Sequence, residues 1–179
     1  MKPRSPRRAT AAARAPLSGL EVQIAWRGTK PWVPAQVVRE AVAATLRSRR
    51  SKLRRLSIAF VGDREIARLH AEWLGDPTVT DVITFDLRPA PPRPGSRPLA
   101  ATDDGPEAEL VVGARHARRI AQERGVPARR ELILYVVHGV LHLCGLDDRR
   151  PADRAAMRRA EARVMRGLGH GVDEGEHDG

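Results

Sequence analysis

Two histidines late in the chain have the residue type and spacing of a metal site. His138 and His142 stand four residues apart in an apolar segment. An α-helix repeats about every 3.6 residues, so both imidazoles would lie on one face of such a helix. A buried helix tolerates one hydrogen-bonded histidine, but two on one apolar face are hard to satisfy with protein partners alone. The pair, rather than either residue, therefore predicts a bound metal ion.

A glycine and two carboxylates follow the histidines. Gly145 can adopt the left-handed conformation that ends a helix, so the chain can fold back and bring Asp148 towards the imidazoles. His138, His142 and Asp148 would then form a three-ligand set with an open fourth position, as in catalytic rather than structural zinc sites. We therefore predict one Zn²⁺ per chain, held by these three residues.

The neighbouring residues narrow the chemistry. Position 139 is a glycine, so the glutamate general base of the HExxH metallopeptidases is missing, which argues against proteolysis. The bound ion would acidify a water molecule and polarise a bond to be hydrolysed. Asp147 is a candidate base or a partner that orients a histidine, and a simple helix-end cap is an equally good interpretation. No other catalytic residue is identified.

Length and composition limit the class of protein. A chain of 179 residues suits one domain, which we place at 20–168. The single cysteine, Cys144, excludes an internal disulfide, and there is no apolar run of signal-peptide length or of the ~20 residues that span a membrane. We therefore expect a cytoplasmic protein with no membrane partner; no feature of the sequence indicates its oligomeric state.

The formal net charge of +10 and a pI near 11.2 favour a polyanionic partner. Most of the basic residues are arginines, which bind phosphate oxygens in pairs. Arg115, Arg118 and Arg119 recur in one predicted helix and are candidate RNA-binding residues. An ordinary solvated helix face explains them equally well.

Three segments lack the pattern of regular structure. Residues 1–19 contain several basic residues and no acid, which predicts a disordered basic tail, although an organellar transit peptide has a similar composition. Residues 88–107 contain six prolines and predict a long surface loop, disordered over its length. Residues 169–179 predict a disordered acidic tail.

The remaining segments alternate between strand and helix patterns. Strands are predicted at 21–26, 56–60, 80–87 and 109–113, and helices at 34–49, 63–75, 114–123, 129–144 and 151–168. Leu56, Ile58 and Phe60 share one face of their strand, and Asp63 is the expected N-cap of a helix that bears Ile66 and Trp73. The helix at 129–144 is apolar nearly all round and should be central and buried. This order predicts an α+β fold, a small mixed four-stranded sheet packed against about five helices, with the metal site at the end of the buried helix.

The motif HGVLHLCGLDD at 138–148, read with TDVITF at 80–85, resembles the YbeY family of bacterial rRNA-maturation factors. The resemblance runs from about Glu21 to Leu168. It implies a single-strand-specific, zinc-dependent endoribonuclease that acts in 16S rRNA 3′-end maturation and ribosome quality control. The implied partners are single-stranded rRNA and the ribosome or its small subunit.

Two departures from the family pattern affect the site. The pattern has a third histidine where this chain has Asp148, and an arginine where it has Leu74. Aspartate is itself a good zinc ligand, so we expect metal binding to persist, with a less acidic bound water. Leu74 removes a cation that a phosphate would favour. A non-catalytic ribosome-assembly factor that binds rRNA or a ribosomal protein, with a structural metal, is the main alternative. A hydrolase of another phosphoester or an amide is a third.

Overall fold

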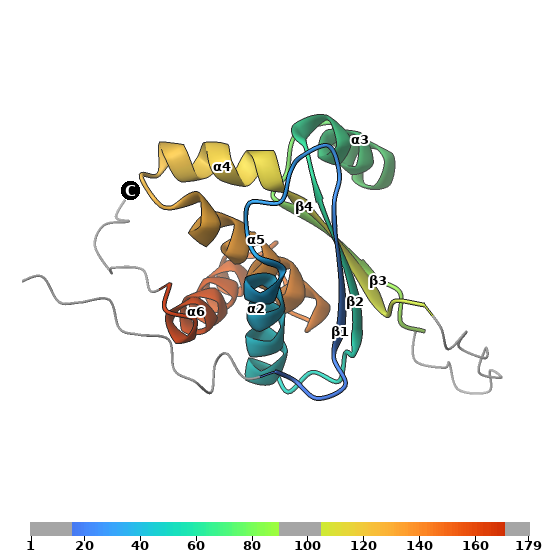
Figure 1. Ribbon diagram of the computed structural model, residues 1–179, viewed down its shortest axis with the longest axis vertical. Helices are drawn as coiled ribbons and strands as arrows, with labels where there is room; N and C mark the ends of the chain where they lie inside the picture. The colour runs from blue at the N-terminus through green and yellow to red at the C-terminus, as the bar shows by residue number, and fades with distance from the viewer. Residues whose placement is uncertain (1–15, 90–104, 171–179) are drawn as a thin grey trace, which may run out of the picture.

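The computed structural model describes residues 16–89 and 105–170 (Figure 1). The tails and loop predicted to be disordered fall largely in 1–15, 90–104 and 171–179, outside the described residues. Within the described ranges the elements are, in chain order, β1 (Glu21–Trp26), α2 (Ala35–Ser48), β2 (Arg55–Val61), α3 (Asp63–Leu74), β3 (Val82–Asp86), β4 (Ala108–Gly113), α4 (Ala114–Glu123), α5 (Ala128–Leu143) and α6 (Pro151–Gly167).

The four strands form one mixed sheet in the order β1-β2-β4-β3. β1, β2 and β4 run parallel, and β3 pairs antiparallel with β4 at the edge. Parallel neighbours need a crossover connection, and α2 provides it between β1 and β2. The predicted α+β class, with four strands in a mixed sheet and five helices in the described residues, is confirmed.

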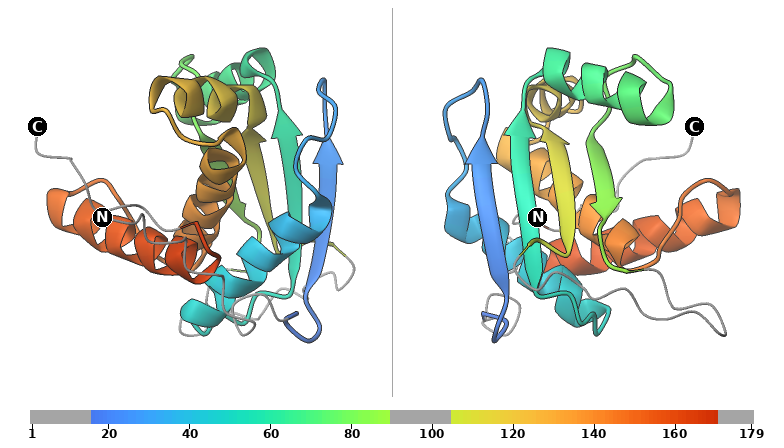
Figure 2. Two further views of the ribbon diagram at one scale, coloured as in Figure 1. Left: turned by 60° about the vertical axis from the view of Figure 1, so that its left-hand side comes forward. Right: turned by 90° about the vertical axis from the view of Figure 1, so that its right-hand side faces the viewer.

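The two faces of the sheet carry different cores. Leu56, Ile58 and Phe60 of β2 point into the main core, as their alternation predicts, whereas Ala59 and Val61 belong to a smaller cluster on the other face. α2, α5 and α6 lie on the main-core side, and α3 lies on the other side at one end of the sheet (Figure 2). Among the described residues, no helix is both long enough and apolar enough to cross a membrane.

The centre of the main core is α5, which contacts α2, α4, α6, β3 and β4. Its side chains are buried on several sides, including Leu132, Val136 and Leu141 at 0% exposure. Fully burying one such aliphatic side chain contributes roughly 1.5–3 kcal/mol. The predicted central buried helix is therefore present, and it holds the two candidate metal ligands in a rigid setting.

Two local predictions differ from the structure. The N-cap of α3 is Gly62, and Asp63 is the first helical residue, so the predicted Asp63 cap is wrong. Asp63 instead accepts a hydrogen bond from Arg119 at 3.1 Å, and its charge still favours the positive end of the helix dipole. β3 is shorter than predicted, because the Asp81 carboxylate accepts the Val82 N–H at 2.8 Å and forms a turn before the strand.

Gly139 is the point where α5 comes closest to the sheet. A Cβ atom at this position would lie 2.9 Å from Leu110 Cδ2 and 3.0 Å from Val82 Cγ2. Both distances are shorter than normal carbon–carbon contacts, and Leu110 is itself buried. Position 139 thus faces the sheet and has no room for a side chain, which explains why the peptidase glutamate could not stand there.

We expect Gly139→Ala to lower the free energy of unfolding by about 1–2 kcal/mol. Overpacking a core costs about 1–3 kcal/mol, and the better helix propensity of alanine returns up to ~1 kcal/mol. Urea denaturation measures the difference. Gly62→Ala is the control, because its Cβ would meet nothing within 4 Å. A Gly139→Ala protein as stable as the wild type would contradict this packing.

Candidate metal centre

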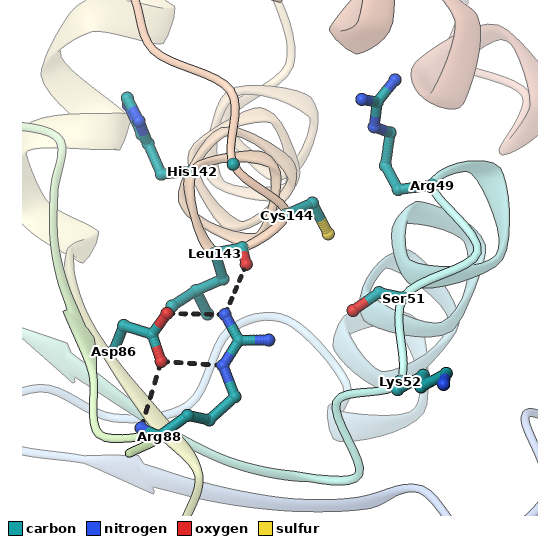
Figure 3. A pocket seen from close by; sticks show the side chains of 9 residues that line it. Arg49, Ser51, Lys52, Asp86, Arg88, His142, Leu143 and Cys144 are labelled. Carbon is teal, nitrogen blue, oxygen red and sulfur yellow. Dashed lines mark hydrogen bonds and ion pairs between the residues drawn. The ribbon is translucent and has the colours of Figure 1, made fainter. Parts of the chain in front are cut away.

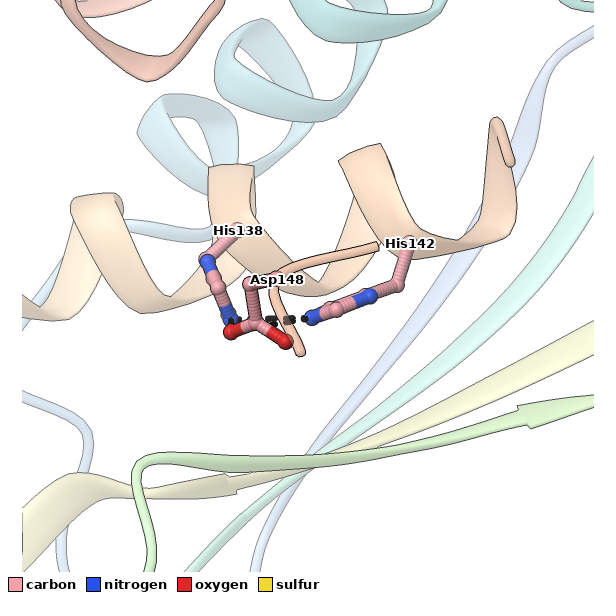
Figure 4. Close-up of side chains that lie close together, drawn as sticks. All are labelled: His138, His142 and Asp148. Carbon is pink, nitrogen blue, oxygen red and sulfur yellow. Dashed lines mark hydrogen bonds and ion pairs between the residues drawn. The ribbon is translucent and has the colours of Figure 1, made fainter. Parts of the chain in front are cut away.

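The two histidines lie on the last turns of α5, where the helix emerges from the core (Figure 4). Their side chains are 16% exposed for His138 and 26% exposed for His142. The imidazole rings are nearly perpendicular, with centroids 4.5 Å apart, and their Nε2 atoms approach to 3.0 Å. The four-residue spacing therefore brings both rings to one point, as the helical repeat requires.

A glycine turn brings the third candidate ligand back to the helix. Gly145 has a φ of 86°, and its N–H donates to the His142 carbonyl at 2.8 Å. The Leu146 N–H donates to the Leu141 carbonyl at 3.1 Å, which completes the Schellman pattern of helix termination. Beyond this turn the Asp148 carboxylate Oδ2 lies 3.6 Å from His138 Nε2 and 3.9 Å from His142 Nε2. The predicted chain reversal at Gly145 is present.

The Nδ1 atoms of both histidines are already engaged. His138 Nδ1 lies 2.6 Å from Glu161 Oε1 of α6, and His142 Nδ1 lies 2.9 Å from the Leu146 carbonyl oxygen. A carbonyl and an ionised carboxylate only accept hydrogen bonds, so each Nδ1 carries the proton. In the neutral rings each Nε2 therefore presents a lone pair to the space shared with Asp148.

Three atoms with lone pairs thus point towards one another, and none of them carries a hydrogen that could form a hydrogen bond to the others. His138 Nε2, His142 Nε2 and Asp148 Oδ2 are 3.0–3.9 Å apart. Zinc bonds of about 2.0–2.1 Å in tetrahedral geometry would place ligand atoms roughly 3.3 Å apart, within this range. Such a set can be satisfied only by a cation, which is either a metal ion or an extra proton. These residues therefore fit a divalent metal ion.

The surroundings of His138 favour positive charge at this point. Burial by itself lowers the pKa of His138, but the hydrogen bond to Glu161 and the negative charges of Asp81 and Asp148 outweigh burial and leave the pKa raised. The same field stabilises a bound metal cation. Because a metal must displace the proton, metal affinity should weaken as the pH falls through the raised pKa.

Asp147 supports the loop that carries Asp148. Its Oδ1 accepts the backbone N–H of Asp148 at 2.8 Å and that of Arg149 at 3.3 Å. These hydrogen bonds, the one from Asp148 first, lower the pKa of the exposed Asp147 carboxyl, which makes it a weaker base. In the described part of the chain, no hydrogen bond joins it to either histidine.

The three candidate RNA-binding arginines lie on α4. Arg118 stacks over the Trp32 ring at 4.4 Å, and Arg119 pairs with Asp63 at 3.1 Å. Neither these two nor Arg115 lines the pockets that adjoin the candidate metal ligands. Their contact with RNA stays a prediction.

Two pockets that His142 lines contain, besides Leu74, residues that sequence patterns did not single out. A pocket of about 550 Å³ is lined by His142 and Asp148 together with Trp73, Leu74 and Phe85. Trp73 and Leu74 are 61% and 65% exposed, although the helical pattern places Trp73 with the buried Ile66. A second pocket, of about 400 Å³, also borders His142, and its lining includes the basic residues Arg49, Lys52 and Arg88. The run of basic residues at 47–52 was the one available signal for that pocket.

We expect Glu161→Gln to weaken zinc affinity about 10–100-fold, because partners that orient a metal-binding histidine typically contribute this much. A glutamine keeps the shape of the side chain but loses the charge that holds the Nδ1 proton. Competition with a chromophoric chelator measures the affinity. Glu123→Gln, at a side chain that is 60% exposed on α4, is the matched control. Equal affinities in both variants would remove Glu161 from the site.

Comparison with known proteins places the whole site inside one family. The family model "Endoribonuclease YbeY" matches residues 30–169. A protein of that name from Anaeromyxobacter sp. (strain Fw109-5) is 40% identical over 114 residues, covering 64% of this chain and 54% of that protein. Its namesake from Anaeromyxobacter dehalogenans (strain 2CP-C) is 34% identical over 148 residues, covering 81% of this chain and 72% of that protein.

A solution structure of a Thermotoga maritima protein matches 88% of this chain and 100% of its own, with 20% identity and a TM-score of 0.49. The match to the first relative spans about half of that protein's length, 54%. The family model covers the candidate ligands, Glu161 and every element from α2 to α6. The chain belongs to the YbeY family.

Proposed function

We propose that this chain is a zinc-dependent endoribonuclease that cuts single-stranded rRNA in 16S 3′-end maturation and in ribosome quality control. The observation that carries the proposal is the convergence of two imidazole lone pairs and one carboxylate oxygen, 3.0–3.9 Å apart, beside a pocket lined by His142 and Asp148. Relatives named endoribonuclease YbeY support the reaction class. The proposal includes contact with the ribosome or its small subunit and a cytoplasmic location.

The residues at the site have two kinds of role: some would bind the metal ion, and others orient the residues that bind it. His138, His142 and Asp148 would hold the ion, while Glu161 and the Leu146 carbonyl fix the two rings. A bound zinc ion supplies a Lewis acid that polarises a phosphodiester oxygen and makes water more acidic. Asp148 adds negative charge to the ligand set, which lowers its net positive charge relative to a third histidine.

The pocket beside the ligands favours an unpaired nucleobase. Trp73 packs edge-on against Phe85, with ring centroids 5.4 Å apart, and 61% of Trp73 remains exposed. Exposed aromatic rings beside a nucleic-acid site stack bases of any sequence, and only an unpaired base offers its face. Leu74 extends this apolar wall. An RNA single strand therefore fits the pocket better than a duplex does.

We expect His138→Ala and His142→Ala each to abolish zinc content and to reduce RNA cleavage to the background of a chelator control. Either change leaves at most two of the three ligands. Metal analysis and a single-turnover assay on single-stranded RNA measure the two effects. His70→Ala is the control, because His70 contacts the Thr78 carbonyl instead.

Two outcomes would replace the proposal. If zinc-loaded wild-type protein binds RNA without cutting it, the chain is a ribosome-assembly factor with a structural metal. If RNA is inert while small phosphoesters or amides turn over, it is another kind of hydrolase. Cleavage by the metal-free His138→Ala protein at the wild-type rate would remove zinc from the mechanism.

We expect Trp73→Ala to weaken binding of single-stranded RNA about 5- to 150-fold and to leave duplex RNA binding unchanged, because stacking of one base contributes about 1–3 kcal/mol. Fluorescence anisotropy measures both affinities. Leu87→Ala is the matched control, since Leu87 is also exposed, at 51%, but does not line the pocket. An equal loss for duplex and single strand would contradict a stacking role.

A further inference from the structure

A basic pocket of about 400 Å³ adjoins the candidate metal centre at His142 and is separate from the pocket of Trp73 (Figure 3). We name it the Arg88 pocket; its walls include Arg49, Ser51, Lys52, Asp86, Arg88 and His142. The Arg88 pocket and the pocket of Trp73 share Asp86, His142 and Leu143. A strand that crosses the metal centre would therefore pass from one pocket into the other.

Arg88 is held rigidly at one wall of the pocket. Its Nε and Nη2 donate to the two oxygens of Asp86 at 2.8 and 2.6 Å, and Nη2 also donates to the Leu143 carbonyl at 2.9 Å. Such a two-point pair fixes the plane of the guanidinium group. The remaining nitrogen, Nη1, faces the pocket in Figure 3 and makes no hydrogen bond within the described ranges.

The other polar groups of the pocket suit an anion. The Ser51 hydroxyl faces the same space as the Arg88 guanidinium, while the exposed side chains of Arg49 and Lys52 start from the opposite wall and extend away from Arg88 (Figure 3). Neither of these two cations has a side-chain partner among residues 16–89 and 105–170. Burial raises the pKa of the Cys144 thiol, so this group is neutral. The lining of the pocket thus contains three cations and one carboxylate, Asp86.

We infer that the Arg88 pocket binds one backbone phosphate of the RNA strand whose neighbouring phosphate lies at the metal centre. A fixed guanidinium N–H, a hydroxyl and two mobile cations are the groups that hold a nucleic-acid phosphate in register without reading its base. The inference rests on the proposed function, because it assigns the pocket to the same substrate. The consequence is that the pocket sets which phosphodiester of the strand reaches the metal centre.

The double variant Arg49→Ala/Lys52→Ala tests the inference without disturbing the fold, because both side chains are on the surface. Fluorescence anisotropy measures how tightly the full-length, zinc-loaded protein binds a short single-stranded RNA between ~0.05 and ~1 M salt. Each measurement is completed before the RNA is cleaved. Each phosphate contact contributes about 0.7 to the slope of log affinity against log salt. If the double variant loses one phosphate contact, the slope should fall by about 0.7. Between ~1 M and ~0.05 M salt, the RNA affinity of the double variant should then rise about eightfold less than that of the wild type.

Arg64→Ala is the matched control, since Arg64 is exposed at the start of α3 and lines neither pocket. Inorganic phosphate is the second probe: it should compete with RNA for the wild-type protein at lower concentration than for the double variant. A wild-type slope in the double variant, or no RNA binding by the wild type, overturns the inference.

The two proposals can fail separately. If the double variant binds RNA with a weaker salt dependence but the wild type does not cleave RNA, the phosphate pocket is supported and the nuclease activity is not. If the wild type cleaves RNA but the double variant keeps the wild-type salt slope, the nuclease activity is supported and the phosphate pocket is not.

Discussion

The site depends on how α5 ends. The Gly145 turn satisfies the last carbonyls of the helix, and the same turn presents the Leu146 carbonyl to His142 Nδ1 and returns Asp148 to the helix face. Arg88 donates to a further carbonyl of this helix end, that of Leu143. A residue with a Cβ at 145 would be strained at a φ of 86°. One backbone conformation thus determines the tautomer of His142, the position of Asp148 and one wall of the Arg88 pocket.

The second constraint comes from packing around α5. Gly139 lets the helix approach Leu110 and Val82, and α6 packs against α5 so that Glu161 reaches His138 Nδ1. The candidate metal ligands therefore come from one helix and its loop, but their orientation depends on α6 and the sheet as well. A ligand that binds only the native state stabilises it, by ~2.7 kcal/mol at a hundred times its dissociation constant, so a metal ion held by these residues would link its binding to folding.

The sequence predicted the parts of the site that follow from local geometry. A four-residue spacing places His138 and His142 on one helical face, and a glycine after a helix predicts the turn, so these needed no tertiary information. Glu161 lies 23 residues from His138, and its contact depends on how α6 packs. The exposure of Trp73 likewise could not be predicted from periodicity, because α3 extends past the edge of the sheet that buries Ile66. Arg49, Lys52 and Arg88 line one pocket only because the ends of α2 and β3 lie beside the end of α5.

The charge next to the candidate ligands is largely negative, and Leu74 contributes no cation there. The candidate ligands and their support already include two carboxylates, Asp148 and Glu161, and Asp81 acts on His138 from nearby. A phosphate approaching this centre meets negative charge that one divalent ion only partly offsets. On the Leu74 side, Trp73, Leu74 and Phe85 form an apolar wall that favours a base, and Arg149 is the one cation in the lining of that pocket, so most of the compensating cations stand on the other side of His142. Arg88, Arg49 and Lys52 occupy that side, and this asymmetry would orient a bound strand with its base towards Trp73 and its phosphate towards Arg88.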